Sequence, residues 1–114
     1  MKTLRIAVAT KGQKRLEDEV SEVFGRTKTI TIIDTEDGEV KNVEVMQNPA
    51  ASYRFGAGPI LVKTLVDMKI DTVVAAELGP GASALVTDHR ITKVTVKPGI
   101  RVDEAIRTVQ LQHS

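Results

Sequence analysis

The sequence has no cysteine and no tryptophan, and it contains only one tyrosine and two phenylalanines among its 114 residues. Without cysteine, the chain cannot form disulfides, ligate zinc through thiolates or hold an iron–sulfur cluster through its own sulfur atoms. The scarcity of aromatic rings disfavours a reader of single-stranded nucleic acid, because such proteins stack bases on several exposed rings. The net charge is only +1 and the basic residues are dispersed, so we expect no nucleic-acid partner.

The sequence also lacks a long hydrophobic run and the pattern of a signal peptide. A membrane-spanning helix needs roughly 18 or more consecutive apolar residues, so we expect a cytoplasmic protein that does not associate with membranes. The hydrophobic fraction of 41% and the charged fraction of 27% are ordinary for a globular protein. We therefore expect residues 1–114 to form a single domain.

The apolar pattern predicts strands and helices in the order β-α-β-β-α-β-α-β-α. A short first helix is indicated by Leu16, Val20, Val23 and Phe24, which share one helical face, and Gly25 is expected to end it with a positive φ. Later helices are expected to begin at Pro59, after Gly79-Pro80-Gly81, and at Val102. The expected strands are Thr3–Ala9, Thr27–Ile33, Val40–Met46, Thr72–Ala76 and Thr92–Val96.

The predicted fold class is α/β, with a five-stranded mixed sheet and helices on both faces. Strands Thr27–Ile33 and Val40–Met46 are expected to form a hairpin, because an Asp-Gly pair lies between them. Helical connections follow Val40–Met46 and Thr72–Ala76, which predicts parallel pairing of these two strands and Thr92–Val96.

Two glycine-rich turns precede predicted helices, at Phe55–Pro59 and Leu78–Ser83. Glycine lets the backbone approach a ligand closely, and the free amides of a helix's first turn attract anions. The first turn follows a long loop, Gln47–Gly58, and long loops often carry function. The alternative is that both turns only join strands to helices tightly.

Catalytic motifs are sparse. The Gly56–Gly58 pair has Leu61 where a dinucleotide fingerprint needs its third glycine, and neither turn has the ending of a P-loop. His89 is expected at the surface, and His113 is next to the last residue. The first strand lacks the carboxylate that two-metal ribonuclease H chemistry requires. We therefore expect no enzyme.

Several segments in order resemble the dinitrogenase iron–molybdenum cofactor biosynthesis family, which includes nitrogenase accessory factors and stand-alone proteins of archaea and anaerobic bacteria. The resemblance spans nearly the whole chain, from Ile6 to about Val109. The segments that carry it are Ile6–Ala9, Val20–Arg26 (similar to Ser-x-x-Phe-Gly-Arg), Asn48–Ala51, Gly56–Gly58, Ile70–Val74 and Leu78–Ala82.

The resemblance implies a ribonuclease H-like fold and a non-catalytic protein that binds or carries an iron–sulfur or iron–molybdenum type cofactor or its precursor. It implies a metal cofactor or a cofactor-assembly protein as the partner. The family's loop and its two glycine turns map onto Asn48–Gly58 and Gly79–Ser83. The site residues expected on this basis are Asn48, Ser52, Tyr53, Arg54, Gly56, Gly58, Gly79, Gly81 and Ser83.

The sequence departs from the family where metal-binding relatives often carry histidine or cysteine, because here the loop reads Ser52-Tyr53-Arg54-Phe55. Soft metals prefer thiolate or imidazole ligands, so no metal ligand is assigned. Arg54 and the helix N-termini could hold an anionic cluster electrostatically, and Met46 could supply a thioether.

Two other functions remain open. Tyr53, Arg54 and Phe55 are residue types enriched at protein interfaces, which favours an interaction module that has lost its metal site, unless Phe55 packs under the loop. Arg26 and Arg54 could instead bind a small anionic metabolite in an enzyme, although no general base is evident. Substitutions of Asn48 and Gly58 are expected to disturb ligand binding more than folding.

Overall fold

The structure is a computed structural model, and it describes residues 2–112. The chain forms a five-stranded sheet, three α-helices and one short 3₁₀ turn. In chain order the elements are β1 (Thr3–Thr10), the 3₁₀ turn η1 (Arg15–Glu17), β2 (Thr29–Glu36), β3 (Glu39–Gln47), α1 (Ala57–Asp67), β4 (Thr72–Ala75), α2 (Pro80–Asp88), β5 (Thr92–Thr95) and α3 (Val102–Gln112).

The sheet is mixed and has the strand order β3-β2-β1-β4-β5. Strand β1 pairs antiparallel with β2 and parallel with β4, so it is the centre of the sheet. Its residues 6–9 are buried, as expected for a strand that is covered on both faces. The predicted α/β class and the hairpin of β2 and β3 are confirmed, whereas the ribonuclease H-like label stays a prediction.

The predicted parallel pairing of Val40–Met46 with Thr72–Ala76 is wrong. Strand β3 is at the edge of the sheet, and β2 and β1 separate it from β4. The parallel strands that pair are β1, β4 and β5. The physical reason is burial: β1 is apolar on both faces and needs neighbours on both sides, whereas most of β3 is exposed and suits an edge.

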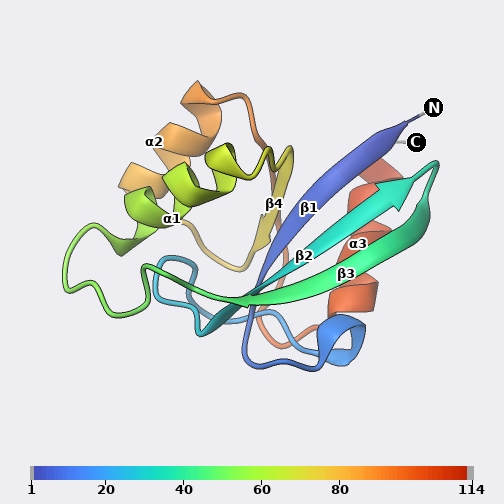
Figure 1. The fold of residues 1–114 in the computed structure, drawn as a ribbon, viewed down its shortest axis with the longest axis horizontal. Coiled ribbons are helices and arrows are strands. Elements are labelled where there is room, and N and C mark those ends of the chain that lie inside the picture. The colour runs from blue at the N-terminus through green and yellow to red at the C-terminus, as the bar shows by residue number, and fades with distance from the viewer. Residues whose placement is uncertain (1, 113–114) are drawn as a thin grey trace.

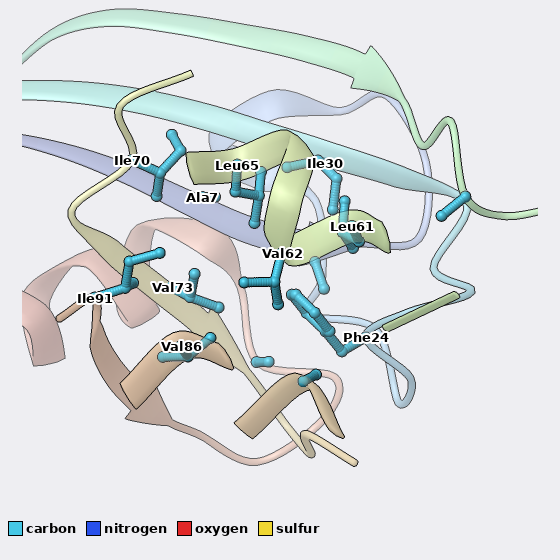
Figure 2. Packing of buried hydrophobic residues seen from close by; sticks show 14 of the residues in the cluster. Ala7, Phe24, Ile30, Leu61, Val62, Leu65, Ile70, Val73, Val86 and Ile91 are labelled. Atoms are coloured by element: carbon cyan, nitrogen blue, oxygen red, sulfur yellow. The ribbon is translucent and has the colours of Figure 1, made fainter. Parts of the chain in front are cut away.

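Helices cover both faces of the sheet, as predicted. Figure 1 shows α1 and α2 on one side and α3 on the other. Leu61 and Leu65 of α1 and Val86 of α2 pack on β1, β2 and β4. Figure 2 shows Phe24 beside Leu61 and Val62 in this cluster. The predicted stripe of α3 packs on the opposite face.

The predicted helix through Leu16 and Phe24 is wrong, because only η1 is helical in this part of the chain. Asp18 is the reason: its buried carboxylate accepts the backbone amides of Gly12, Lys14 and Glu19, so it favours a turn over a helix. Val20 then pairs as an isolated bridge with Thr10. The four apolar residues therefore do not share a face, and Val23 is exposed.

A membrane-spanning helix was not expected. Across residues 2–112, each helix is too short or too polar to cross a bilayer.

Candidate functional site

A pocket of about 440 Å³ lies where α1 and α2 begin, at the edge of the sheet where β1, β3 and β4 end. Its volume falls within the usual range of small-ligand sites. We call it the interhelical pocket. The residues that line it are Glu22, Val23, Phe24, Gly25, Arg26, Arg54, Gly56, Ala57, Gly58, Pro59, Glu77, Gly79, Gly81 and Ala82.

Glycines bring three backbone segments together around this pocket. A Cβ placed on Gly25 would lie 2.5 Å from the backbone nitrogen of Gly58, a distance that real Cβ atoms do not reach. A Cβ on Gly58 would lie 3.2 Å from that of Ala82, in the first turn of α2. Much of the pocket wall is therefore backbone rather than side chain.

Gly25 was expected to end a helix with a positive φ, and this prediction is wrong. The glycines with positive φ are Gly38, Gly56 and Gly99 within the described part of the chain. Gly25 is instead required for its close approach to α1. Sequence alone does not distinguish these two uses of glycine, because both appear as one small residue after an apolar stretch.

Both helices that open at the pocket begin with a glycine cap. Gly56 precedes α1 with a left-handed φ of 72°, and Gly79 precedes α2 in an extended conformation. Neither cap supplies a side-chain hydrogen bond to the helix. Pro59 and Pro80 have no N–H, so the amides that these first turns can offer are those of residues such as Gly58 and Gly81, which no side-chain cap occupies. The two helix dipoles add positive potential at the same place.

The side chains of the pocket contribute charges of both signs. Glu22 and Glu77 are balanced by Arg26 and Arg54, so the helix N-termini supply the positive excess. Within residues 2–112, no three histidine, cysteine, aspartate or glutamate residues come together as a metal site. This donor set does not fit a cluster whose metals are ligated by protein side chains, but it fits an anion that carries its own ligands.

Arg26 holds the loop of residues 48–56, which we call the 48–56 loop. Its Nε and Nη2 atoms donate to the carbonyl oxygen of Tyr53 at 3.1 and 2.8 Å, and Nη2 also donates to that of Arg54 at 2.9 Å. Figure 1 shows this loop projecting from the sheet before α1 begins. Because Arg26 also lines the pocket, it contacts both features.

Asn48 anchors the start of the 48–56 loop. Its buried side-chain amide donates to the carbonyl oxygens of Gly25 and Thr27, both at 2.9 Å, and accepts the amide of Ala50. These three bonds join the loop to the segment that forms one wall of the pocket. Asn48 itself does not line the pocket.

Five of the predicted site residues line the pocket, and four do not. The lining residues are Arg54, Gly56, Gly58, Gly79 and Gly81. The others are Asn48, Ser52, Tyr53 and Ser83; Ser52 and Tyr53 are exposed, and Ser83 accepts a hydrogen bond from Lys93. The direct role of all nine in binding stays a prediction.

The pocket is also lined by residues that were not among the nine predicted site residues, including Glu22, Gly25, Arg26 and Glu77. The resemblance did contain a signal for two of them, because Gly25-Arg26 ends the Ser-x-x-Phe-Gly-Arg segment. No local pattern indicates the two glutamates, since exposed acids are common on any soluble surface. His89 is exposed at the end of α2, and His113 lies outside the described residues.

Comparison with known proteins identifies the family. The dinitrogenase iron–molybdenum cofactor family matches residues 2–112. The chain belongs to this family. An uncharacterised protein of Methanocaldococcus jannaschii is 30% identical over 59 residues, and the match covers 52% of this chain and 50% of that relative. The chain thus matches half the length of that relative.

Solved structures share the fold. The apo form of the orange protein from Desulfovibrio gigas is similar with a TM-score of 0.85 and 22% identity, over 95% of this chain and 88% of that one. An NMR structure from Thermotoga, of a protein described as NifB-like and as a member of the DUF35 family, has a TM-score of 0.75 and 30% identity over the same shares. Both likenesses support the fold, and the family assignment rests on the family model over residues 2–112.

Proposed function

We propose that the chain is a non-catalytic cytoplasmic domain that binds or carries an anionic iron–sulfur or iron–molybdenum type cofactor, or a precursor of one. The observation that carries this proposal is the interhelical pocket, where two helix N-termini without side-chain caps and Arg54 surround a wall of glycine backbone. The family of the chain is named for the same class of cofactor.

The cargo must bring its own metal ligands, because the chain has no cysteine and no histidine lines the pocket. Backbone amides and Arg54 can then hold it through hydrogen bonds to its outer, negatively charged atoms. Such binding is reversible and weakened by salt, since the charges involved are near the surface. Reversible binding suits a protein that delivers its cargo to a cofactor-assembly protein.

The test is retention of tetrathiomolybdate, a dianion whose molybdenum already carries sulfur ligands, after anaerobic gel filtration and metal analysis. We expect stoichiometric retention at low ionic strength and release in about 1 M salt, where the Debye length is only about 3 Å. Absence of retention at low ionic strength would sink the proposal.

A matched pair of variants locates the binding. Arg54→Gln removes a charge from the pocket, whereas Arg107→Gln removes one from α3 on the opposite face of the sheet. We expect only the first substitution to weaken retention. Equal weakening by both would indicate attraction by net charge rather than a site.

The interaction module remains the second candidate, because one observation favours it. Phe55 is 84% exposed and Tyr53 is 49% exposed, so the idea that Phe55 packs under the loop is wrong. In this case the partner is a cofactor-assembly protein and the pocket holds no cargo. Two measurements on wild type and Phe55→Ser distinguish the candidates: binding to a cofactor-assembly protein and retention of tetrathiomolybdate. If the chain is an interaction module, Phe55→Ser abolishes the complex and neither protein retains tetrathiomolybdate, whereas for a carrier both retain it.

A further inference from the structure

Arg26 has an unusual position between the pocket and the 48–56 loop. A guanidinium group has five N–H donors, and Arg26 uses three of them on the carbonyl oxygens of Tyr53 and Arg54. These three come from Nε and Nη2. Within the described residues, Nη1 makes no hydrogen bond to the protein, so Nη1 is the nitrogen that Arg26 can offer to a ligand in the pocket that it lines.

The middle of the 48–56 loop depends on this one side chain. Asn48 secures the start of the loop, and Gly56 ends it where α1 begins. Between them, the carbonyl oxygens of Tyr53 and Arg54 accept from Arg26, and the Tyr53 amide donates to Ala50. Arg26 is itself exposed, so water competes for these bonds and the loop is held only moderately.

An anion bound to Nη1 would change this balance. It would fix the plane of the guanidinium, because a planar fork cannot turn one edge without turning the other. It would also polarise the remaining N–H groups and strengthen their bonds to the loop. Occupancy of the pocket would thereby be linked to the order of residues 53–55.

We infer that Arg26 is a positioning residue that couples binding of an anion in the interhelical pocket to the conformation of the 48–56 loop, so that the exposed Tyr53 and Phe55 are presented in one arrangement when the pocket is filled. This inference rests on the proposed function for the identity of the ligand. If the coupling holds, a protein that contacts the loop can distinguish the chain with a filled pocket from the chain with an empty one.

The loop carries its own reporters. Tyr53 is the only tyrosine and the chain has no tryptophan, so tyrosine fluorescence anisotropy monitors this loop alone. Arg54 is exposed, so the bond between Arg54 and Phe55 is a site for trypsin, and mass spectrometry measures its cleavage rate. Neither reporter requires a label.

The first arm uses the free protein. Arg26→Gln is expected to lower the anisotropy of Tyr53 and to raise cleavage after Arg54 about fivefold, the effect of losing roughly one net hydrogen bond. Thermal unfolding checks that the variant is folded. Arg54→Gln removes a pocket charge but leaves the backbone carbonyl oxygens in place, so its anisotropy should equal that of wild type. Equal anisotropy and cleavage in wild type and Arg26→Gln would overturn the inference.

The second arm adds tetrathiomolybdate, and inorganic phosphate in parallel. We expect tetrathiomolybdate to slow cleavage after Arg54 in wild type but not in Arg26→Gln. Arg26→Lys keeps the charge but lacks the fork, so it should also show no protection, and full protection in this variant would overturn the inference.

The outcomes separate the inference from the proposed function. Retention of tetrathiomolybdate without protection of the loop overturns the coupling and leaves the carrier function intact. Protection by phosphate that needs Arg26, with no retention of tetrathiomolybdate, overturns the proposed cargo and leaves the coupling intact. If no anion alters the loop or is retained, both are wrong.

Discussion

Two buried polar side chains organise two connections at the same edge of the sheet, and they do so in opposite ways. Asp18 accepts three amides of its own segment, those of Gly12, Lys14 and Glu19. Asn48 instead joins its loop to a different segment, through the carbonyl oxygens of Gly25 and Thr27. The first arrangement closes a segment on itself, whereas the second anchors one end of a loop and leaves its tip exposed.

This difference leaves the two connections unequally exposed at one edge of the molecule. The segment with Asp18 forms a turn where the sequence predicted a helix. The loop after Asn48 reaches the interhelical pocket through Arg54 and presents Tyr53 and Phe55 to solvent. Loops of the second kind suit ligand-dependent behaviour, because their tips can reorder at a small cost in free energy.

The largest effect is expected from Gly25→Ala. This substitution disturbs the contact between the connection that follows β1 and the first turn of α1. Its Cβ would be 2.5 Å from the nitrogen of Gly58, so α1 must shift. We expect a loss of about 3 kcal/mol in the free energy of unfolding, measured by denaturant titration. Gly79→Ala is the matched control, because nothing lies within 4 Å of its Cβ and its φ of −63° suits alanine. Equal losses for both variants would contradict the close approach.

The next largest effects are expected from substitutions of Asp18 and Asn48, the two buried polar side chains compared above. Asp18→Ala removes the buried acceptor of three amides in a partly buried turn, and Asn48→Ala removes the donor to the partly buried or buried carbonyl oxygens of Gly25 and Thr27, so each should cost about 2 kcal/mol. Only Asn48→Ala should also accelerate trypsin cleavage after Arg54, because only Asn48 secures that loop. If Asp18→Ala accelerated this cleavage equally, the two connections would not be independent.

The same experiment tests the expectation that Asn48 affects binding more than folding. Its burial and three hydrogen bonds indicate that folding is also affected. Parallel loss of thermal stability and of tetrathiomolybdate retention would show that its role is purely structural.

Gly58→Ala should have a smaller effect on stability and a larger one on binding. Its Cβ would meet that of Ala82 at 3.2 Å, and the resulting strain is partly offset by the better helix propensity of alanine. We expect a net change below about 1 kcal/mol. The added methyl group pushes apart the starts of α1 and α2, so the Kd for tetrathiomolybdate should rise. An unchanged Kd would place the ligand elsewhere.

The smallest effect on stability is expected from Phe55→Ser at the loop tip. A side chain that is 84% exposed contributes little to folding, so the free energy of unfolding should change by less than about 0.5 kcal/mol. Retention of tetrathiomolybdate should also be unchanged. A larger loss of stability would mean that the ring packs against the protein in solution.

Much of the fold could be predicted from the sequence, because the strongest patterns are local. The hairpin, the central strand and the stripe of α3 all follow from alternation, burial or helical spacing that the chain carries within a few residues. The expected helix at Leu16 failed because its apolar spacing competed with the carboxylate of Asp18, whose partners are set by the fold. Local spacing does not include that competition.

Part of the lining of the interhelical pocket could be predicted for a similar reason. Glycine turns before helices indicate where a helix begins, and the carboxyl ends of parallel strands meet at one edge, so Gly56, Gly79 and Gly81 could be assigned to one place. Arg26 holds the loop through backbone carbonyl oxygens 27 and 28 residues away. No side-chain pattern indicates such a bond, because every residue has a carbonyl oxygen.

By itself, the sequence determined the composition of any possible site and the class of the fold. The absence of cysteine excludes thiolate ligation wherever the chain folds, and the order of apolar segments predicts an α/β sheet with helices on both faces. Only the tertiary structure decided that β1 is central, that Gly25 contacts Gly58, and that Arg26 joins the pocket to the 48–56 loop. These features depend on packing between distant segments, and the energy of such packing is defined only once the segments meet.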